Sequence, residues 1–286
     1  MRATLIFLFF YFFLFSCMRL EANEKTVSTS DSTIDTVEKI SDNSNGNIDI
    51  ERLRTLFLSH FATRFPSPLL TQIGNNFELF YAELSALFND EKTQDLLKLV
   101  DKTHFLSSTF EPDDLVPLSN NEYYSVSRND MLLTAEAELA LKKMAIASKE
   151  DGVTLVVSSA YRTYTYQKGL FDRYAAQYGE AAASRFSARA GTSQHQLGTA
   201  IDFGSITDEF AETRAGKWVL QHAHLYGFSL SYPKDYEHIT GYMWECWHYR
   251  YIGVHACALQ KKWFLDIQQY LLEAIHFFLT DLEKLI

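Results

Sequence analysis

Two residues with metal-binding side chains lie close together in residues 191–202, which read GTSQHQLGTAID. The His195 imidazole and the Asp202 carboxylate are separated by a turn that Gly198 permits and by a short predicted strand, so both can face one point. Imidazole nitrogen and carboxylate oxygen are a ligand pair that suits zinc. The same pair also occurs as a hydrogen-bonded structural contact, so this segment alone leaves both interpretations open.

A second segment, residues 239–253, reads ITGYMWECWHYRYIG and supplies further ligand types. His248 would complete a set of two histidines and one carboxylate, which leaves the fourth zinc position open for water, as hydrolytic zinc sites require. Glu245 precedes it by three residues and would be the spare carboxylate that takes the proton of that water. Together the two segments favour a hydrolytic zinc site.

The patterns S-x-H-x-x-G-x-A-x-D and E-x-W-H in these segments resemble the VanY-like D-alanyl-D-alanine carboxypeptidases, a family of LAS-type zinc metallopeptidases. The resemblance covers roughly residues 114–253 and includes the LVPL segment at 115–118 and the SSAYR turn at 158–162. It implies Zn²⁺ as the cofactor, with these roles: His195, Asp202 and His248 as zinc ligands, and Glu245 as the catalytic base.

Arg162 follows a predicted strand at a strand-to-helix turn. An exopeptidase must hold the free carboxylate of its substrate, and a planar guanidinium suits that group. The resemblance implies that Arg162, Gln167 and Ser193 are substrate anchors. The residues alone also allow structural roles. Arg162 could form a surface salt bridge, Gln167 could lie on a helix surface, and Ser193 could cap a turn. Trp247, between the base and a ligand, is expected to wall the pocket and exclude water.

Cys246 stands where relatives in this family often have proline, and we expect its side chain to point away from Glu245 on an extended segment. If the chain is exported, Cys246 and Cys257 could form a disulfide, although two free buried cysteines are the favoured interpretation. Four other histidines match no ligand position and are assigned to packing or the surface: His222, His224, His238 and His255.

The elements that must position these residues are of mixed type. Helices are predicted at residues 134–149, 163–178, 181–186, 212–226 and 254–286, and strands at 153–158, 200–203, 228–232 and 241–249. Because these elements do not alternate as βαβ units with Gly-rich loops, we predict an α+β fold with a small, mainly antiparallel sheet flanked by helices. Three short helices in residues 48–110 would form a helical appendage, followed by a zinc peptidase domain at 111–286 that ends in a C-terminal helix.

Residues 1–17 contain Arg2 followed by an apolar run, which predicts a signal peptide because the run is too short to span a bilayer comfortably. The sequence LFSC ending at Cys17 resembles a bacterial lipobox, so Cys17 is predicted to be lipidated. An uncleaved signal anchor and simple secretion are the alternatives. Residues 18–47 are rich in Ser, Thr, Asn and Asp, which predicts a flexible tether.

The composition is that of a folded globular protein, with 47% hydrophobic and 22% charged residues. The formal net charge of -10 provides no basic surface for nucleic acid. The resemblance implies a zinc carboxypeptidase that removes C-terminal D-alanine from peptidoglycan stem peptides, and the predicted signal peptide and lipobox lead us to expect that it is exported and tethered to a membrane of the cell envelope. The alternatives are an L,D-carboxypeptidase or peptidoglycan endopeptidase with the same site, and a non-catalytic envelope lipoprotein that binds peptidoglycan.

Overall fold

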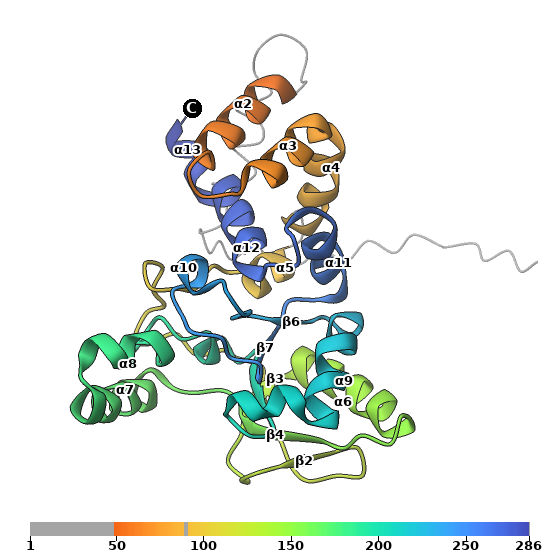
Figure 1. The fold of residues 1–286 in the computed structure, drawn as a ribbon, viewed down its shortest axis with the longest axis vertical. Helices are drawn as coiled ribbons and strands as arrows, with labels where there is room; N and C mark the ends of the chain where they lie inside the picture. The colour runs from red at the N-terminus through yellow and green to blue at the C-terminus, as the bar shows by residue number, and fades with distance from the viewer. Residues whose placement is uncertain (1–48, 89–90, 286) are drawn as a thin grey trace, which may run out of the picture.

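The computed structural model describes residues 49–88 and 91–285 (Figure 1). The α-helices are α2 (Ile50–His60), α3 (Ser67–Asn75), α4 (Phe77–Phe88), α5 (Glu91–Leu96), α6 (Ala135–Glu150), α7 (Tyr164–Tyr178), α8 (Glu180–Phe186), α9 (Arg214–His222), α10 (Glu237–Thr240), α11 (Val254–Trp263), α12 (Gln268–His276) and α13 (Leu282–Leu285). Shorter helical turns are η1 (Gln194–Leu197), η2 (Asp208–Glu212), η3 (Ala223–Tyr226) and η4 (Phe277–Asp281). The strands are β1 (Leu115–Pro117), β2 (Tyr124–Val126), β3 (Leu132–Thr134), β4 (Leu155–Ser159), β5 (Ala200–Phe203), β6 (Phe228–Leu230) and β7 (His248–Tyr251).

A five-stranded sheet in the order β2-β4-β5-β7-β6 lies at the centre of the lower half in Figure 1. The β2–β4 pair is parallel and the other neighbours are antiparallel, while β1 and β3 form a separate antiparallel pair. The predicted α+β class with a small, mainly antiparallel sheet is confirmed. In this sheet Asp202 is opposite Ser159 on one side and opposite His248 on the other.

Two large hydrophobic clusters hold most of the elements together, and a third, small one contains Val100, Leu106 and Leu197. One joins the sheet to α6 and α9, with Leu141, Val157 and Phe203 at its centre. The other joins α2, α3 and α4 to the C-terminal helices α11 to α13, which lie beside them at the top of Figure 1. Phe57 is fully buried in the second cluster and stacks on Phe278, with ring centroids 5.5 Å apart. The helices at the two ends of the described chain therefore share one core.

The N-terminal and C-terminal helical segments are more divided than predicted. The described residues 50–88 and 91–96 form four helices, because Asn76 leaves the helical conformation between α3 and α4. The single helix predicted over 254–286 is wrong, since α11 and α12 are separated by a turn in which Leu265 and Asp266 have φ values of 56° and 61°. Hydrophobic periodicity runs through such a turn unchanged, so it does not reveal this break.

The strand predicted over residues 241–249 is also wrong over most of its length. Gly241 has φ 79° and ends α10 in the left-handed region, and strand β7 begins only at His248. The intervening backbone bonds to other loops, because Met243 N donates to the Arg185 carbonyl and Glu245 N to the Tyr232 carbonyl. This segment is therefore a loop that places Glu245 just before the start of β7, next to the ligand His248.

Cys246 and Cys257 are both free and buried, as the favoured interpretation held. The Cys246 thiol points toward the backbone carbonyls of Thr207 and Asp208, 3.6 and 3.7 Å away.

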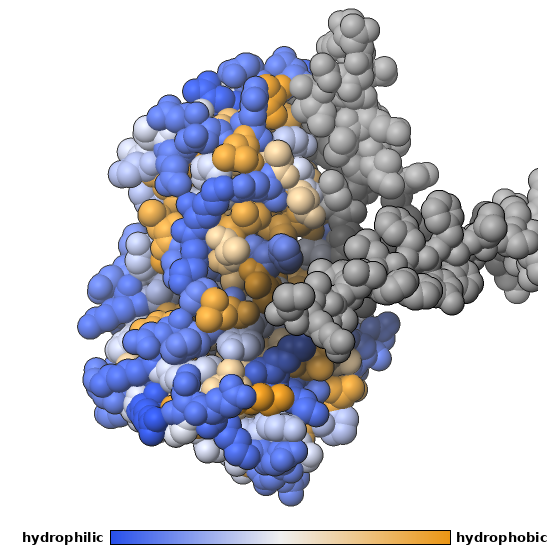
Figure 2. Space-filling model, turned by 90° about the vertical axis from the view of Figure 1, so that its right-hand side faces the viewer, coloured by the Kyte–Doolittle hydropathy of each residue, from blue (hydrophilic) through white to orange (hydrophobic). Residues whose placement is uncertain are grey.

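None of the helices in residues 49–88 and 91–285 is both long and apolar enough to cross a membrane. On the face shown in Figure 2, hydrophobic residues are interspersed among hydrophilic ones. The predicted signal peptide, the tether and Cys17 lie outside the described residues.

Candidate metal centre and active-site pocket

The sheet register and one short helical turn bring His195, Asp202 and His248 together. Asp202 and His248 are directly opposite each other in the β5–β7 ladder, and His195 lies in η1, just before β5. Ser193 begins η1 by accepting a bond from His195 N, and Gly198 ends it with φ 69°. The ligand atoms of the three residues lie within 4.8 Å of one another, and all three side chains are buried.

In both histidine rings, the nitrogen that points away from Asp202 contacts a carbonyl oxygen, which orients the ring. His195 Nδ1 lies 2.7 Å from the Ala160 carbonyl, and His248 Nε2 lies 3.2 Å from Gln194 Oε1. The opposite nitrogens face Asp202, with His195 Nε2 3.2 Å from Oδ2 and His248 Nδ1 2.9 Å from Oδ1. A histidine that donates its outer N–H to a carbonyl presents its other nitrogen as a lone pair. The donor set therefore fits a zinc ion beside Asp202.

The electrostatic environment keeps His195 and Asp202 in the metal-binding protonation state. Burial, with a smaller effect from the Arg162 guanidinium, lowers the pKa of His195 to about 4. Burial alone would raise the pKa of the Asp202 carboxyl, but His195, His248 and Arg162 hold it well below its usual value. A neutral imidazole and an ionised carboxylate are the forms that bind a metal ion.

Glu245 lies beside the cluster, with Oε2 3.8 Å from His248 Nδ1. Its side chain is buried, and burial together with the negative charge of Asp202 raises its pKa well above the usual value. A carboxyl group with a raised pKa is a better proton acceptor once ionised. The geometry thus places a proton-exchanging group next to the ligand atoms.

Arg162 joins the strand β4 to the cluster. Its Nη2 donates to Asp202 Oδ2 at 2.7 Å and to Ser159 Oγ at 2.8 Å. Its Nη1 makes a longer bond of 3.4 Å to Gln167 Oε1, and Gln167 is held in turn by the Ala188 carbonyl at 2.7 Å. Since Nη1 carries two N–H groups, it has a donor left for a substrate carboxylate.

These groups open into one cavity of about 430 Å³. The predicted residues Arg162, Gln167, Ser193, Glu245 and Trp247 all line it, together with the three ligand candidates. Sequence analysis missed several aromatic lining residues: Tyr174, Tyr178, Phe186, Tyr232 and Tyr242. Their positions in predicted helices and strands carried no signal that distinguishes a pocket wall from a packed surface. The four remaining histidines of the sequence analysis lie elsewhere, as His222, which stacks on Trp218, illustrates.

Known proteins resemble this chain in sequence and in fold. Residues 130–254 match the VanY family, described as D-alanyl-D-alanine carboxypeptidase. The putative carboxypeptidase YodJ of Bacillus subtilis (strain 168) is 36% identical over 202 residues, which cover 65% of this chain and 74% of YodJ. The LdcB LD-carboxypeptidase structure is 34% identical with a TM-score of 0.55, over 64% of this chain and 88% of LdcB.

A structure of the vancomycin resistance D,D-pentapeptidase VanY from a VanB-type cassette contains Zn(II) and is 29% identical to this chain. The match has a TM-score of 0.52 and covers 62% of this chain and 99% of that one. The fold and the buried His/Asp/His cluster define a zinc-dependent carboxypeptidase. The chain belongs to the VanY family of D-alanyl-D-alanine carboxypeptidases, as the sequence resemblance predicted.

Proposed function

We propose that this protein removes the C-terminal D-alanine from peptidoglycan stem peptides. The observation that carries the proposal is the placement of Arg162 and Glu245 in one cavity with His195, Asp202 and His248. A carboxylate anchor, a proton acceptor and a metal-binding set are the three parts that a metallocarboxypeptidase needs. The family to which the chain belongs supports D-alanine as the released residue.

In this proposal His195, Asp202 and His248 hold the zinc ion. When bound, zinc lowers the pKa of a bound water to about 7 and polarises the scissile carbonyl. Glu245 accepts a proton from the attacking water and passes it to the nitrogen of the departing D-alanine. The half-buried Trp247 covers this region and excludes bulk water, which strengthens the electrostatic interactions inside.

Arg162 gives the proposal its exopeptidase character. Its free N–H on Nη1 would bind the C-terminal carboxylate of the substrate, with Gln167 steadying the guanidinium and Ser193 providing a further polar contact at the cavity wall. An endopeptidase cleaves an internal bond, where no carboxylate of this kind lies beside the scissile carbonyl. The guanidinium therefore favours release of a terminal residue.

A second candidate is L,D-carboxypeptidase action, in which the residue before the released D-alanine has the L configuration. The similarity to the LdcB LD-carboxypeptidase favours it, because that match has a higher TM-score and identity than the match to the D,D-pentapeptidase VanY. The two activities use the same zinc chemistry and differ in the pocket around the penultimate residue. We favour D,D activity on the family description.

The setting of the reaction is part of the proposal. Peptidoglycan lies outside the cytoplasm, so the chain would be exported through residues 1–17 and anchored by lipid at Cys17. A non-catalytic lipoprotein that only binds peptidoglycan is disfavoured, since a structural zinc site has no use for a spare carboxylate such as Glu245.

The test is the product profile of the full chain, loaded with zinc, on defined tetrapeptide and pentapeptide stems, with Glu245→Ala as the inactive control. Release of D-alanine from the pentapeptide alone supports D,D specificity. Release from the tetrapeptide alone supports L,D specificity, and cleavage inside the stem supports an endopeptidase. Absence of any product from the zinc-loaded wild type would overturn the carboxypeptidase proposal.

A further inference from the structure

A chain of buried polar side chains connects His248 to helix α12. His248 Nε2 lies 3.2 Å from Gln194 Oε1, and Gln194 Nε2 donates to Gln268 Oε1 at 3.1 Å. Gln268 Nε2 donates onward to the Ser229 carbonyl at 3.3 Å. The Ser231 hydroxyl lies 2.7 Å from Gln194 Oε1 and donates to it. All five residues are at most 3% exposed, so water does not compete for these bonds.

The direction of this chain is fixed at its far end, because the Ser229 backbone carbonyl can only accept. Gln268 must therefore turn Nε2 toward Ser229 and Oε1 toward Gln194. Gln194 must then turn Nε2 toward Gln268 and Oε1 toward His248. An oxygen that faces His248 Nε2 requires a proton on that nitrogen. His248 Nδ1 is thereby left to supply the lone pair beside Asp202.

We propose that Gln194 and Gln268 are positioning residues for the zinc site. Gln194 holds the His248 ring in the tautomer and orientation that present Nδ1 to the metal, and Gln268 holds Gln194. The inference rests on the proposed zinc site. Outer hydrogen-bond partners of this kind orient metal-bound histidines and raise their basicity.

Through Gln268, the helices at the two ends of the described chain would help to position the zinc ligand His248. Gln268 begins α12 and lies outside residues 130–254, the segment that matches the VanY family. Helix α12 belongs to the hydrophobic cluster that also contains α2, α3 and α4. The helical cluster is therefore connected to His248 through the side-chain amide of Gln268, which bonds Gln194.

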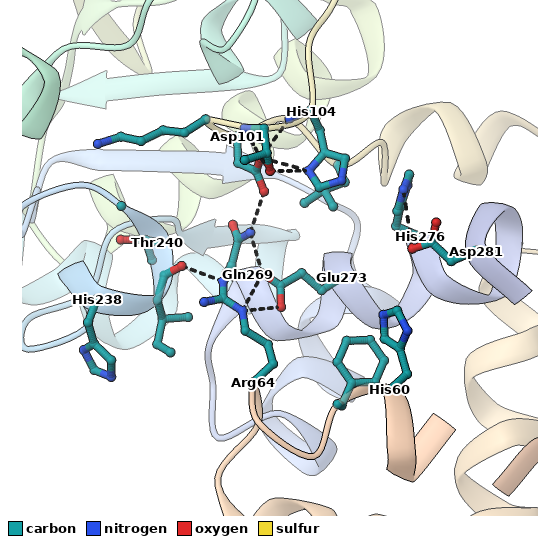
Figure 3. A pocket seen from close by; sticks show the side chains of 16 residues that line it. His60, Arg64, Asp101, His104, His238, Thr240, Gln269, Glu273, His276 and Asp281 are labelled. Atoms are coloured by element: carbon teal, nitrogen blue, oxygen red, sulfur yellow. Dashed lines mark hydrogen bonds and ion pairs between the residues drawn. The ribbon is translucent and has the colours of Figure 1, made fainter. Parts of the chain in front are cut away.

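The neighbouring residue Gln269 is a matched control from the same helix. It is also buried, but its Nε2 donates to Asp101 Oδ2 and to Glu273 Oε1, both at 2.9 Å. Figure 3 shows Gln269 among the residues of a different cavity, where Arg64 pairs with Glu273. Replacing Gln269 removes a hydrogen-bonded amide from α12 without changing the chain to His248.

The test compares zinc affinity, measured by chelator competition, and the absorption spectrum of the Co(II)-substituted full chain. Gln194→Leu should bind zinc about 10- to 100-fold more weakly and alter the Co(II) spectrum. Gln194→Glu should lose less zinc affinity than Gln194→Leu, since a carboxylate still accepts the His248 N–H although it can no longer donate to Gln268 Oε1. Gln268→Leu should show a smaller loss than Gln194→Leu. Gln269→Leu should keep wild-type zinc affinity and spectrum even if its melting temperature falls.

Wild-type affinity in folded Gln194→Leu, or an equal loss in Gln269→Leu, would overturn the proposal. A measurement on the wild type needs no variant to fold: ¹⁵N chemical shifts of His248 in the zinc-loaded protein. We expect a protonated Nε2 and a metal-bound Nδ1, and the reverse assignment would also overturn the proposal. Absence of zinc binding by the wild type would instead contradict the proposed zinc site itself, so the two failures are distinguishable.

Discussion

The guanidinium of Arg162 lies directly against the carboxylate of Asp202, with Nη2 2.7 Å from Oδ2. This contact puts the proposed carboxylate anchor beside the proposed metal ligand. In a peptide, the C-terminal carboxylate and the carbonyl of the last peptide bond are separated by a single residue. In the proposed function, a short distance between anchor and metal would select the last bond of the chain and so give release of one residue.

Glu245→Gln should abolish most of the activity while leaving the metal site intact. The amide keeps the size of the side chain but cannot accept the proton of the attacking water, so kcat should fall by about 10²- to 10⁴-fold. Zinc content measured by atomic emission should stay at the wild-type level, since Glu245 is not among the three ligand candidates. A variant that retains wild-type kcat would show that another group acts as the base.

Arg162→Ala should discriminate poorly between a peptide with a free C-terminus and the same peptide with a C-terminal amide. A hydrogen bond to a charged group contributes about 1.5 to 3 kcal/mol, so kcat/KM on the free-acid peptide should fall by about 10- to 150-fold. The amidated peptide should be a poor substrate of both proteins.

Because Arg162 also bonds Asp202, zinc content of Arg162→Ala must be measured alongside. If the variant keeps its zinc and its full preference for the free acid, Arg162 is not the carboxylate anchor.

In the zinc-free protein, His195 should contribute a loss of stability as the pH falls from neutral toward about 4. Its pKa in the folded state is about 4, against 6.5 for an ordinary histidine. Between these values the unfolded chain binds the proton and the folded chain does not, so unfolding is favoured as the pH falls. The full contribution is about 3 kcal/mol.

Glu245 acts in the opposite sense, because its raised pKa makes the folded state bind the proton more tightly than the unfolded chain. The measurement is therefore a difference: urea unfolding from pH 7 to pH 4, in chelator, of the wild type and of His195→Asn. On acidification, the free energy of unfolding of the wild type should fall relative to that of the variant. Identical pH profiles would contradict the buried, neutral state of His195.

Phe57→Ala should lower the free energy of unfolding by about 3 to 5 kcal/mol, since truncating a buried phenylalanine leaves a cavity. Phe57 is fully buried and its ring lies 5.2 Å from that of Phe80 and 5.6 Å from that of Phe277, at the two ends of the described chain. Leu79→Ala is the control, because Leu79 is half exposed in α4. The measurement is unfolding in denaturant. If both variants lowered the free energy of unfolding by the same small amount, the helices at the two ends would not share a core.

The sequence was sufficient to find the three ligand candidates because they lie in two short motifs that resemble those of a known family. His195 and Asp202 are joined by η1, Gly198 and β5, and strand β5 has the predicted bounds. The register that places Asp202 opposite His248 was not predictable, since pairing depends on contacts between residues far apart in the chain.

Other features had no local signature. Strands β1, β2 and β3 have three residues each, which is too short for alternation to stand out. The contact of Gln194 with Gln268 spans 74 residues, and neither glutamine belongs to a recognisable ligand pattern. The loop before β7 read as a strand because its aromatic residues have high strand propensity, although its backbone bonds are made to other loops.

The most direct test of the central claim is D-alanine release from a synthetic pentapeptide stem by the full chain, measured with zinc bound, after zinc removal, and after zinc is restored. The account predicts release with zinc, loss of release when a chelator removes the metal, and recovery when zinc is added back. Release that is unaffected by complete removal of the metal would contradict it, as would the absence of release by the zinc-loaded protein.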